Sequence, residues 1–240
     1  MLFDQKIAII GGSSGIGFAV AQAAADAGAE VIIGSSSEAK LKGTLAAFTE
    51  RVEGRLIDVT QEESVREFFD KVGEVDHVAV TVGASYEPAL VVNSDLLESQ
   101  KPFLFKYWGE FLIAKYAGSR LTNCGSITLT SGILSQRPAM KLAAQASVNA
   151  AIEALGRTLA VELAPRRANV VCPGFIDTGK VFADVPAPQR AAQLLELKGT
   201  DLPVQRVGQP KDAAAAYIFA MENPYVTGQV LFVDGGSVIS

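Results

Sequence analysis

Residues 6–25 constrain the fold more than any other part of this chain. Lys6–Ile10 is a short apolar run with β-branched side chains, as expected for a strand that is buried on both faces. Three glycines in the spacing G-x-x-x-G-x-G come after it, and then an alanine-rich helical stretch. A strand, a glycine turn and a helix in this order form a cradle for nucleotide phosphates, because the first N–H groups of the helix point at them.

Each glycine of this turn has an expected role. Gly11 permits a tight turn, Gly15 lets a pyrophosphate approach the backbone, and Gly17 lets the helix pack closely on the strand. The expected nucleotide contacts of the turn are Gly11, Ser13, Ser14, Gly15, Ile16 and Gly17. A glycine-rich turn can also serve packing alone, so the interpretation depends on whether motifs further along the chain agree with it.

Composition bounds the class of protein. The 240 residues are 49% hydrophobic and 20% charged, which fits one globular α/β domain spanning residues 1–240. A net charge of −5 without a basic cluster argues against nucleic acid and anionic membranes as partners. We expect Cys124 and Cys172 to be small core residues in a reducing cytoplasm. With His77 as the single histidine, neither a Ser/His/Asp triad nor a histidine metal site is expected.

Apolar strand candidates alternate with helical stretches along the chain. Strands are expected at Lys6–Ile10, Val31–Ile33, Arg55–Ile57, His77–Val82, Ser126–Thr130, Asn169–Cys172 and Val230–Val233, and helices near Ile16–Ala27, Glu38–Glu50, Glu62–Val72, Asp95–Ala117, Met140–Ala164 and Lys211–Met221. This alternation predicts a Rossmann-type, doubly wound parallel sheet with helices on both faces. Residues 180–207 interrupt the alternation after a late strand, which predicts a lid over a substrate, with an ordinary surface helix as the alternative.

The end of the second expected strand bears on the choice of nucleotide. In NAD-dependent folds a carboxylate about 20 residues past the glycines binds the ribose 2′-OH. Here Ser35, Ser36 and Ser37 stand in that place, and their hydroxyls could hold a 2′-phosphate. The sequence therefore favours NADP(H), with NAD(H) possible. The segment Ser35-x-x-Glu38 is also a capping box, which starts a helix without any ligand.

With four further motifs, the chain resembles the short-chain dehydrogenase/reductase family nearly end to end. The motifs are Asp58-Val-Thr60, the strand Gly125–Ser131, Pro173-Gly174 with Thr178, and the closing run Thr227–Gly236. The resemblance implies a seven-stranded parallel sheet, a bound nicotinamide dinucleotide, a small-molecule substrate and a homodimer or homotetramer. It also implies that Asp58 binds the adenine amine and that Ser131 is the catalytic serine. The remaining cofactor contacts that it implies are Val59, Gly83, Pro173, Gly174, Ile176 and Thr178.

The catalytic residues depart from the family's pattern. The Tyr-x-x-x-Lys pair is absent, because no tyrosine of this chain has a lysine four residues later. Counting back from Glu162 places Gln145 at the tyrosine's position and Asn149 at the lysine's. The family's asparagine is replaced by Lys106, and strict spacing moves the serine position from Ser131 to Gly132.

The chemistry left to these residues is limited. Gln145 can hydrogen-bond a carbonyl but lends no proton near pH 7, and Asn149, one turn later, could bond the nicotinamide ribose. Lys106 is the candidate replacement acid, because burial would lower its pKa from about 10.4. The alternative is a lysine that snorkels from an amphipathic helix. The neighbouring Phe105, Trp108 and Phe111 are expected to be core or subunit-interface residues.

Three functions are compatible with these residues. The first is an NADP(H)-dependent oxidoreductase acting on a small carbonyl or alcohol, with Lys106, Ser131, Gln145 and Asn149 as its catalytic residues and no metal. The second is an inactive NADP(H)-binding sensor or scaffold. The third is an isomerase or dehydratase on the same fold.

Overall fold

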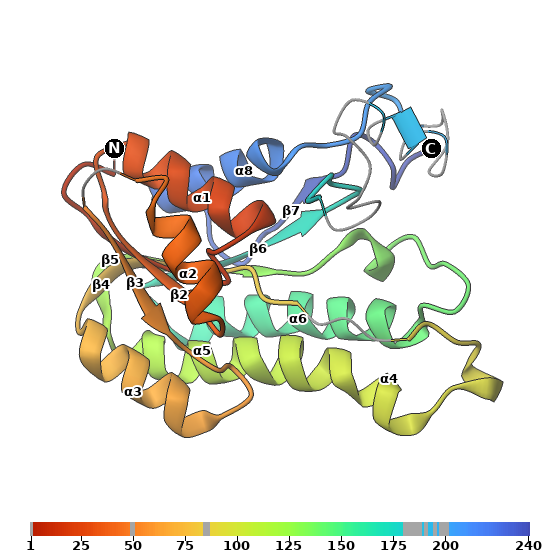
Figure 1. Ribbon diagram of the computed structural model, residues 1–240, viewed down its shortest axis with the longest axis horizontal. Helices are drawn as coiled ribbons and strands as arrows, with labels where there is room; N and C mark the ends of the chain where they lie inside the picture. Colours follow the sequence, from red (N-terminus) through yellow and green to blue (C-terminus); the bar gives the residue numbers. More distant parts are fainter. Residues whose placement is uncertain are drawn as a thin grey trace.

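Seven parallel strands form one sheet between two layers of helices in the described part of the chain (Figure 1). The structure is a computed structural model that describes residues 2–48, 51–83, 87–179 and 202–240, together with residues 189, 192, 193 and 196. The strands are β1 (Lys6–Ile10), β2 (Glu30–Ser35), β3 (Val52–Leu56), β4 (Val75–Val80), β5 (Leu121–Thr130), β6 (Arg167–Pro173) and β7 (Val230–Val233). Their order is β3-β2-β1-β4-β5-β6-β7, so the expected doubly wound sheet is confirmed. The strand order reverses between β1 and β4, where such sheets bind ligands at their carboxyl ends.

The helices cover the two faces of the sheet (Figure 1). They are α1 (Gly15–Asp26), α2 (Glu38–Leu45), α3 (Glu62–Val72), α4 (Leu96–Pro102), α5 (Gly109–Gly118), α6 (Ala143–Glu162) and α8 (Pro210–Glu222), with short turns η1 (Val91–Asn93), η2 (Phe103–Trp108) and η3 (Ile133–Ser135). One apolar core joins the sheet to α1, α2 and α8, and a second joins it to α3, α5 and α6. The central strands β1, β2 and β4 are buried almost throughout because each packs against helices on both faces.

Some expected boundaries were wrong. β3 begins at Val52 rather than Arg55, because it pairs with β2 from the Val31–Val52 register onward. This edge strand is only partly buried, so it lacks the continuous apolar run by which strands were sought. Residues 95–117, expected as one helix, form α4, a π-helical turn (η2) and α5. Pro102 ends α4 because it has no N–H to continue the α-helical hydrogen bonds.

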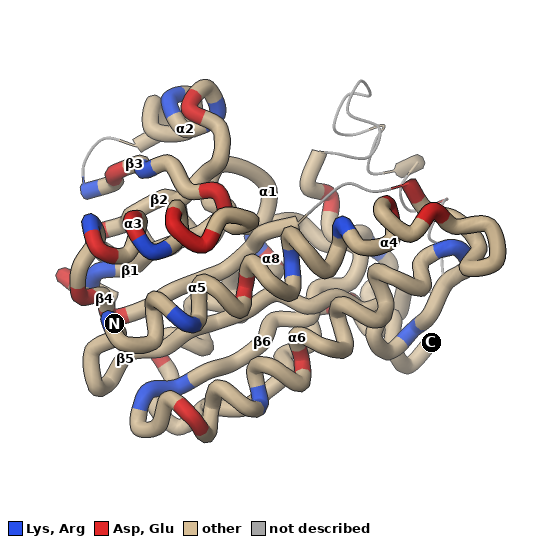
Figure 2. Tube along the Cα trace, turned by 90° about the horizontal axis from the view of Figure 1, so that it is seen from below, with Lys and Arg blue, Asp and Glu red and all other residues tan. Residues whose placement is uncertain are grey.

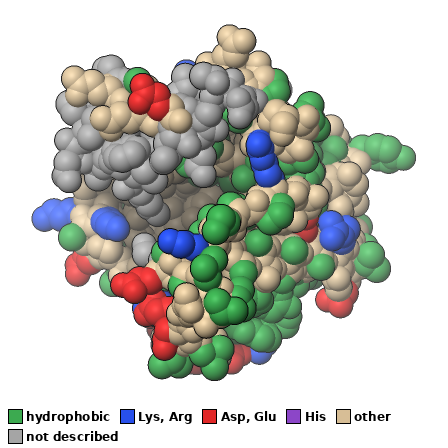
Figure 3. Space-filling model, turned by 90° about the vertical axis from the view of Figure 1, so that its right-hand side faces the viewer, with side chains coloured by type: hydrophobic (Ala, Val, Ile, Leu, Met, Phe, Trp, Pro, Cys, Tyr) green, Lys and Arg blue, Asp and Glu red, His purple; other side chains and the backbone are tan. Residues whose placement is uncertain are grey.

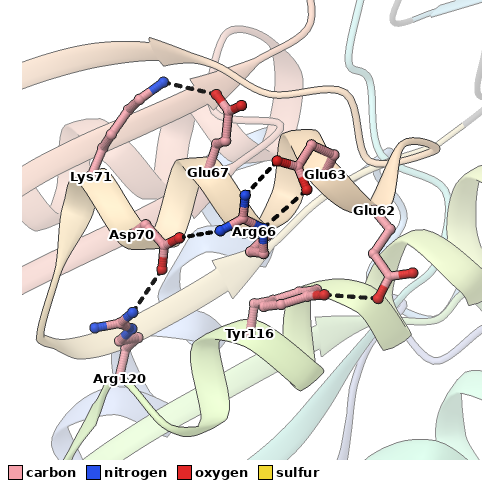
Figure 4. Close-up of polar contacts among 8 residues, drawn as sticks. All are labelled: Glu62, Glu63, Arg66, Glu67, Asp70, Lys71, Tyr116 and Arg120. Carbon is pink, nitrogen blue, oxygen red and sulfur yellow. Dashed lines mark hydrogen bonds and ion pairs between the residues drawn. The ribbon is translucent and has the colours of Figure 1, made fainter.

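Charged side chains fasten α3 to α5 on the surface (Figure 4). Arg66 and Arg120 both donate to the carboxylate of Asp70, at 2.9 and 2.7 Å, and the Tyr116 hydroxyl donates to Glu62 at 2.7 Å. Exposed pairs of this kind each add little to stability. Together they link α3 to α5 and to the turn that follows α5.

Both signs of charge are interspersed along the chain (Figure 2). Within the described ranges, none of the helices has the length and apolar character needed to cross a membrane. Exposed hydrophobic side chains gather on the face that carries α4 (Figure 3). They include Val91, Val92, Leu96, Leu97 and Leu104.

The structure places the histidine and the two cysteines, to which the sequence assigned no catalytic role. His77 is buried between the Ser126 hydroxyl, at 2.8 Å, and the Gln5 side-chain oxygen, at 3.0 Å, and burial lowers its pKa to about 4. It is therefore a neutral, structural histidine at pH 7. Cys172 is buried as expected, but Cys124 is exposed, so the prediction that both are core residues was wrong for Cys124.

Candidate active site

The glycine positions in the turn after β1 leave little room for side chains. Gly11 has a φ of +87°, which favours glycine, and a Cβ at Gly17 would lie 2.4 Å from the Gly11 carbonyl oxygen. A Cβ at Gly15 would lie 3.2 Å from Cβ of Thr178, which brings the predicted nicotinamide segment next to the cradle. α1 has neither a side-chain cap nor an acidic residue in its first turn, so its terminal N–H groups can receive an anion.

A pocket of about 320 Å³ opens beside this turn, at the carboxyl ends of β1, β2 and β4. It brings together the predicted cofactor residues Gly11, Ser13, Ser14, Ser35, Ser36, Asp58, Val59 and Gly83. Ile16 and Gly17 lie behind them in the first turn of α1. The donor set, the uncapped helix and the absence of room for a Cβ all fit a dinucleotide.

Lys40 and Phe105 are among the lining residues of this pocket that the sequence analysis missed. Lys40 lies in the first turn of α2 and lines the pocket beside the serines. Its position one turn after Ser37 was a signal that the sequence offered. Phe105 also lines the pocket, so its expected place in the core or a subunit interface was wrong. Trp108 and Phe111 are exposed over 50% and 40% of their surface in the single chain.

The serine segment has a different local structure from the expected capping box. Ser37, rather than Ser35, caps α2 and accepts a hydrogen bond from the Lys40 N–H at 3.3 Å. Ser35 is buried and its hydroxyl lies 2.9 Å from that of Ser13. The serines of the two turns therefore face one another across the pocket.

A second pocket, of about 550 Å³, lies at the ends of β5 and β6. Five predicted site residues line it: Ser131, Gln145, Asn149, Pro173 and Gly174. The rest of its wall is mostly apolar, with Ile133, Leu134, Pro138, Ala139, Leu142, Phe175 and Leu202. Ile176 forms a bridge to Gly208 just beyond this pocket. The predicted lid, residues 180–207, lies largely outside the described residues.

Lys106 lies behind this pocket rather than on its wall. The π-helical turn η2 carries it inward, and it is only 6% exposed. Its Nζ donates to Oδ1 of Asn149 at 2.6 Å and to the backbone oxygen of Ser131 at 2.7 Å. Burial lowers the pKa of Lys106 to about 8. The sequence predicts Lys106 at the family's asparagine position and Asn149 at its lysine position, and the structure shows these two side chains hydrogen-bonded to each other.

Glu110 is a further buried group that sequence reasoning missed. It lies one turn after Lys106, is fully buried, and accepts a hydrogen bond from the Thr130 N–H at 3.2 Å. Its second carboxyl oxygen has no partner among the described residues. Burial raises the pKa of Glu110 to about 8. The Thr130 hydroxyl in turn bonds the Tyr217 hydroxyl and the Val80 carbonyl.

Ser131 is buried, and its hydroxyl has no hydrogen-bond partner among the described residues. The hydroxyl lies close enough to the Cys172 thiol to lower that group's pKa, although burial has the larger effect and raises it. The backbone of Ser131 is occupied on both sides, since its N–H donates to Val171 and its oxygen accepts from Lys106.

The sheet, the glycine cradle and the two pockets at the carboxyl ends of its strands define a Rossmann-type dinucleotide-binding protein. Residues 10–238 match the family model described as enoyl-(acyl carrier protein) reductase. The short-chain dehydrogenase/reductase ucsE of Acremonium sp. is 34% identical over 258 residues, which cover 100% of this chain and 97% of that protein. The chain belongs to the short-chain dehydrogenase/reductase family, and it is an oxidoreductase by class.

Two solved structures are similar over their whole length. A small-chain dehydrogenase in complex with NADPH is 33% identical, with a TM-score of 0.80 and coverage of 99% of this chain and 100% of that one. The MalC reductase/Diels-Alderase from Malbranchea aurantiaca is 27% identical, with a TM-score of 0.88 and coverage of 100% and 98%.

Proposed function

We propose that this protein is an NADP(H)-dependent oxidoreductase that interconverts a small apolar carbonyl compound and its alcohol with a non-standard set of catalytic residues. One observation carries the proposal. Gln145 and Asn149 offer amide groups on the wall of an apolar pocket that also contains Pro173-Gly174, the segment expected to hold the nicotinamide. The apolar wall favours a hydrophobic substrate body, and the amides favour a neutral hydrogen-bond acceptor such as a carbonyl oxygen.

Several features support NADP(H) as the cofactor. Ser35, Ser36 and the Lys40 ammonium line the first pocket, where a carboxylate would repel a 2′-phosphate. The relative with 33% identity was solved in complex with NADPH. When bound, the nicotinamide would supply or accept the hydride.

The chain's own residues would orient the substrate and stabilise charge. As hydride reaches the carbonyl carbon, negative charge develops on the oxygen, and amide N–H groups held in place stabilise it. Lys106 lines neither pocket among the described residues, so we assign it a charge-stabilising role rather than direct contact with substrate. Its buried charge acts strongly because the surroundings have a low dielectric constant. Because no general acid contacts the substrate, we expect turnover to be slower by about 10²–10⁴ than in a family member that has one.

Single-turnover oxidation of NADPH tests the proposal. The protein is mixed with NADPH and a panel of apolar ketones, and the loss of NADPH absorbance is followed. Lys106→Met should slow the reaction at least about tenfold, because one charged donor is removed. Lys115→Met is the matched control, since Lys115 lies exposed on α5 and bonds Glu62 on the surface. A wild-type protein that binds NADPH but oxidises it with none of the ketones would instead support the sensor or scaffold.

A non-redox reaction is the second candidate, and one comparison favours it. The name of the relative with a TM-score of 0.88 joins a reductase to a Diels-Alderase activity. On this chain the same amides of Gln145 and Asn149 would polarise a substrate carbonyl while the cofactor stays unchanged. Conversion of a substrate without any change in NADPH absorbance would distinguish this function from reduction.

We infer that the protein assembles as a homodimer or homotetramer in the cytoplasm. A groove between α5 and α6 supports this, because Phe111, which is exposed over 40% of its surface, lines it beside Ala151 and Ala154. Light scattering on a sizing column tests the inference, and a monomer at micromolar concentration would contradict it.

A further inference from the structure

The ammonium group of Lys106 fixes the orientation of the Asn149 amide. An ammonium only donates hydrogen bonds, so the atom 2.6 Å from Nζ must be the amide oxygen. The NH₂ group of Asn149 therefore points the other way. Asn149 is 2% exposed and lines the second pocket, so this choice decides which group the amide offers at the wall.

The Asn149 amide nitrogen lies where a side chain at position 132 would begin. A Cβ built on Gly132 would be 2.8 Å from Nδ2 of Asn149. The backbone of Gly132 does not demand glycine, because its φ of 170° and ψ of 152° are extended angles that any residue adopts. The neighbouring amide, rather than the backbone, is thus what keeps position 132 free of a side chain. Position 132 is also where strict spacing places the family's serine.

We propose that the Asn149 amide replaces the serine hydroxyl as the hydrogen-bond donor to the substrate's carbonyl oxygen, with Lys106 as the positioning residue that orients and polarises it. The proposal rests on the proposed function and adds the residue that contacts the reacting oxygen. Ser131 lines the same pocket and is as deeply buried as Asn149, so the Asn149→Ala variant decides which of the two donates. The alkoxide that hydride addition leaves takes its proton from solvent water, so no proton needs to pass from Lys106 through Asn149. The positive charge draws electron density from the amide, which makes its N–H a stronger donor.

With a pKa lowered to about 8, Lys106 still carries its charge near neutral pH. Carboxyl groups approach it from its own helical segment (Glu110) and from α6 (Glu153), and the Cys172 thiol approaches from β6. Tyr217 of α8 interacts electrostatically with Glu110, and its hydroxyl bonds the hydroxyl of Thr130, the residue whose N–H donates to Glu110. Glu110, Glu153 and Cys172 each raise the proton affinity of the lysine, against the larger effect of burial. The Asn149 donor should therefore be polarised at pH 7 and lose that polarisation at alkaline pH.

A pair of substitutions tests the exchange of serine for asparagine. Asn149→Ala should slow single-turnover reduction of cyclohexanone by about 10²–10³, the usual effect of removing one such donor. Gly132→Ser should also slow it, because the new side chain collides with the amide. The double variant Gly132→Ser with Asn149→Ala should be at least about tenfold faster than Asn149→Ala alone, because a serine hydroxyl then has room to donate. A double variant no faster than Asn149→Ala, or an Asn149→Ala protein that keeps its rate, overturns the proposal.

A second measurement separates this proposal from the proposed function. In protein carrying isotope-labelled asparagine and bound NADP⁺, cyclohexanone should shift the Asn149 side-chain amide resonance, which is assigned by its loss in Asn149→Ala. The shift should shrink in Lys106→Met. A shift without turnover would overturn the reductase but support the donor. Turnover without a shift would overturn the donor alone, and the absence of both would overturn both.

Discussion

The substitution Glu110→Gln should destabilise the protein near pH 5 and stabilise it near pH 8. The carboxyl group is fully buried, and burial raises its pKa from 4.5 to about 8. Below pH 4.5 it is protonated in both the folded and the unfolded chain. As the pH rises, the unfolded chain releases this proton and the folded chain keeps it, so the wild-type free energy of unfolding falls by about 1.4 kcal/mol per pH unit. The fall ends where the folded carboxyl ionises, near pH 8.

The size of this pH dependence follows from the pKa shift of Glu110. From pH 4.5 to 8 the accumulated loss is on the order of 5 kcal/mol, as an upper bound. Glutamine keeps an oxygen to accept the Thr130 N–H but buries two unpartnered N–H donors where the protonated carboxyl buries one O–H, and the additional donor costs about 1–3 kcal/mol while the wild-type carboxyl is protonated. The variant should therefore be less stable than wild type near pH 5 and more stable near pH 8.

Urea unfolding at several pH values between 5 and 8 measures this crossing. Glu67→Gln is the control, because it makes the same chemical change on the exposed surface of α3. Its stability should differ from wild type by a nearly constant amount across the range. Parallel stability curves for Glu110→Gln and wild type would refute the reasoning, since they would mean that the buried carboxyl ionises alike in the folded and unfolded chains.

Three further outcomes are expected. Gly17→Ala should abolish NADPH binding in a fluorescence titration, because its Cβ would lie 2.4 Å from the Gly11 oxygen; retained affinity would show that the turn can relax. Lys40→Ala should weaken binding of NADPH about tenfold more than that of NADH, since one ion pair to the 2′-phosphate is lost, and equal losses for both cofactors would contradict this role. The rate of ketone reduction should fall as the pH rises through about 8, where Lys106 loses its charge, and a pH–rate profile of Lys106→Met should lack this decline.

The sequence predicted the features that local patterns decide. The strand, glycine turn and helix at residues 6–25 are contiguous, so their spacing alone placed the cradle. The alternation of apolar runs and helical stretches likewise predicted the parallel sheet. The family resemblance predicted that Gln145, Asn149 and Pro173 belong to one site, and in the structure they line one pocket.

The features that the sequence did not predict depend on contacts between distant segments. Nothing local distinguishes a buried Glu110 from an exposed helical glutamate; its burial results from packing against β5. Phe105 faces the nucleotide pocket because the π-helical turn changes which side chains point inward. A regular α-helix over residues 95–117 would place Phe105 on a different face. Pro102 was the local sign that the regular helix ends there.

Thr130 joins the two helical layers through the sheet itself. Its N–H reaches Glu110 in the layer of α5, while its hydroxyl reaches Tyr217 of α8 on the opposite side. A shift of α8 would therefore disturb the hydrogen bond that holds the Glu110 carboxyl, one helical turn from Lys106. Lys106 in turn bonds the Asn149 amide, so the packing of α8 is connected through the sheet to a side chain on the wall of the second pocket.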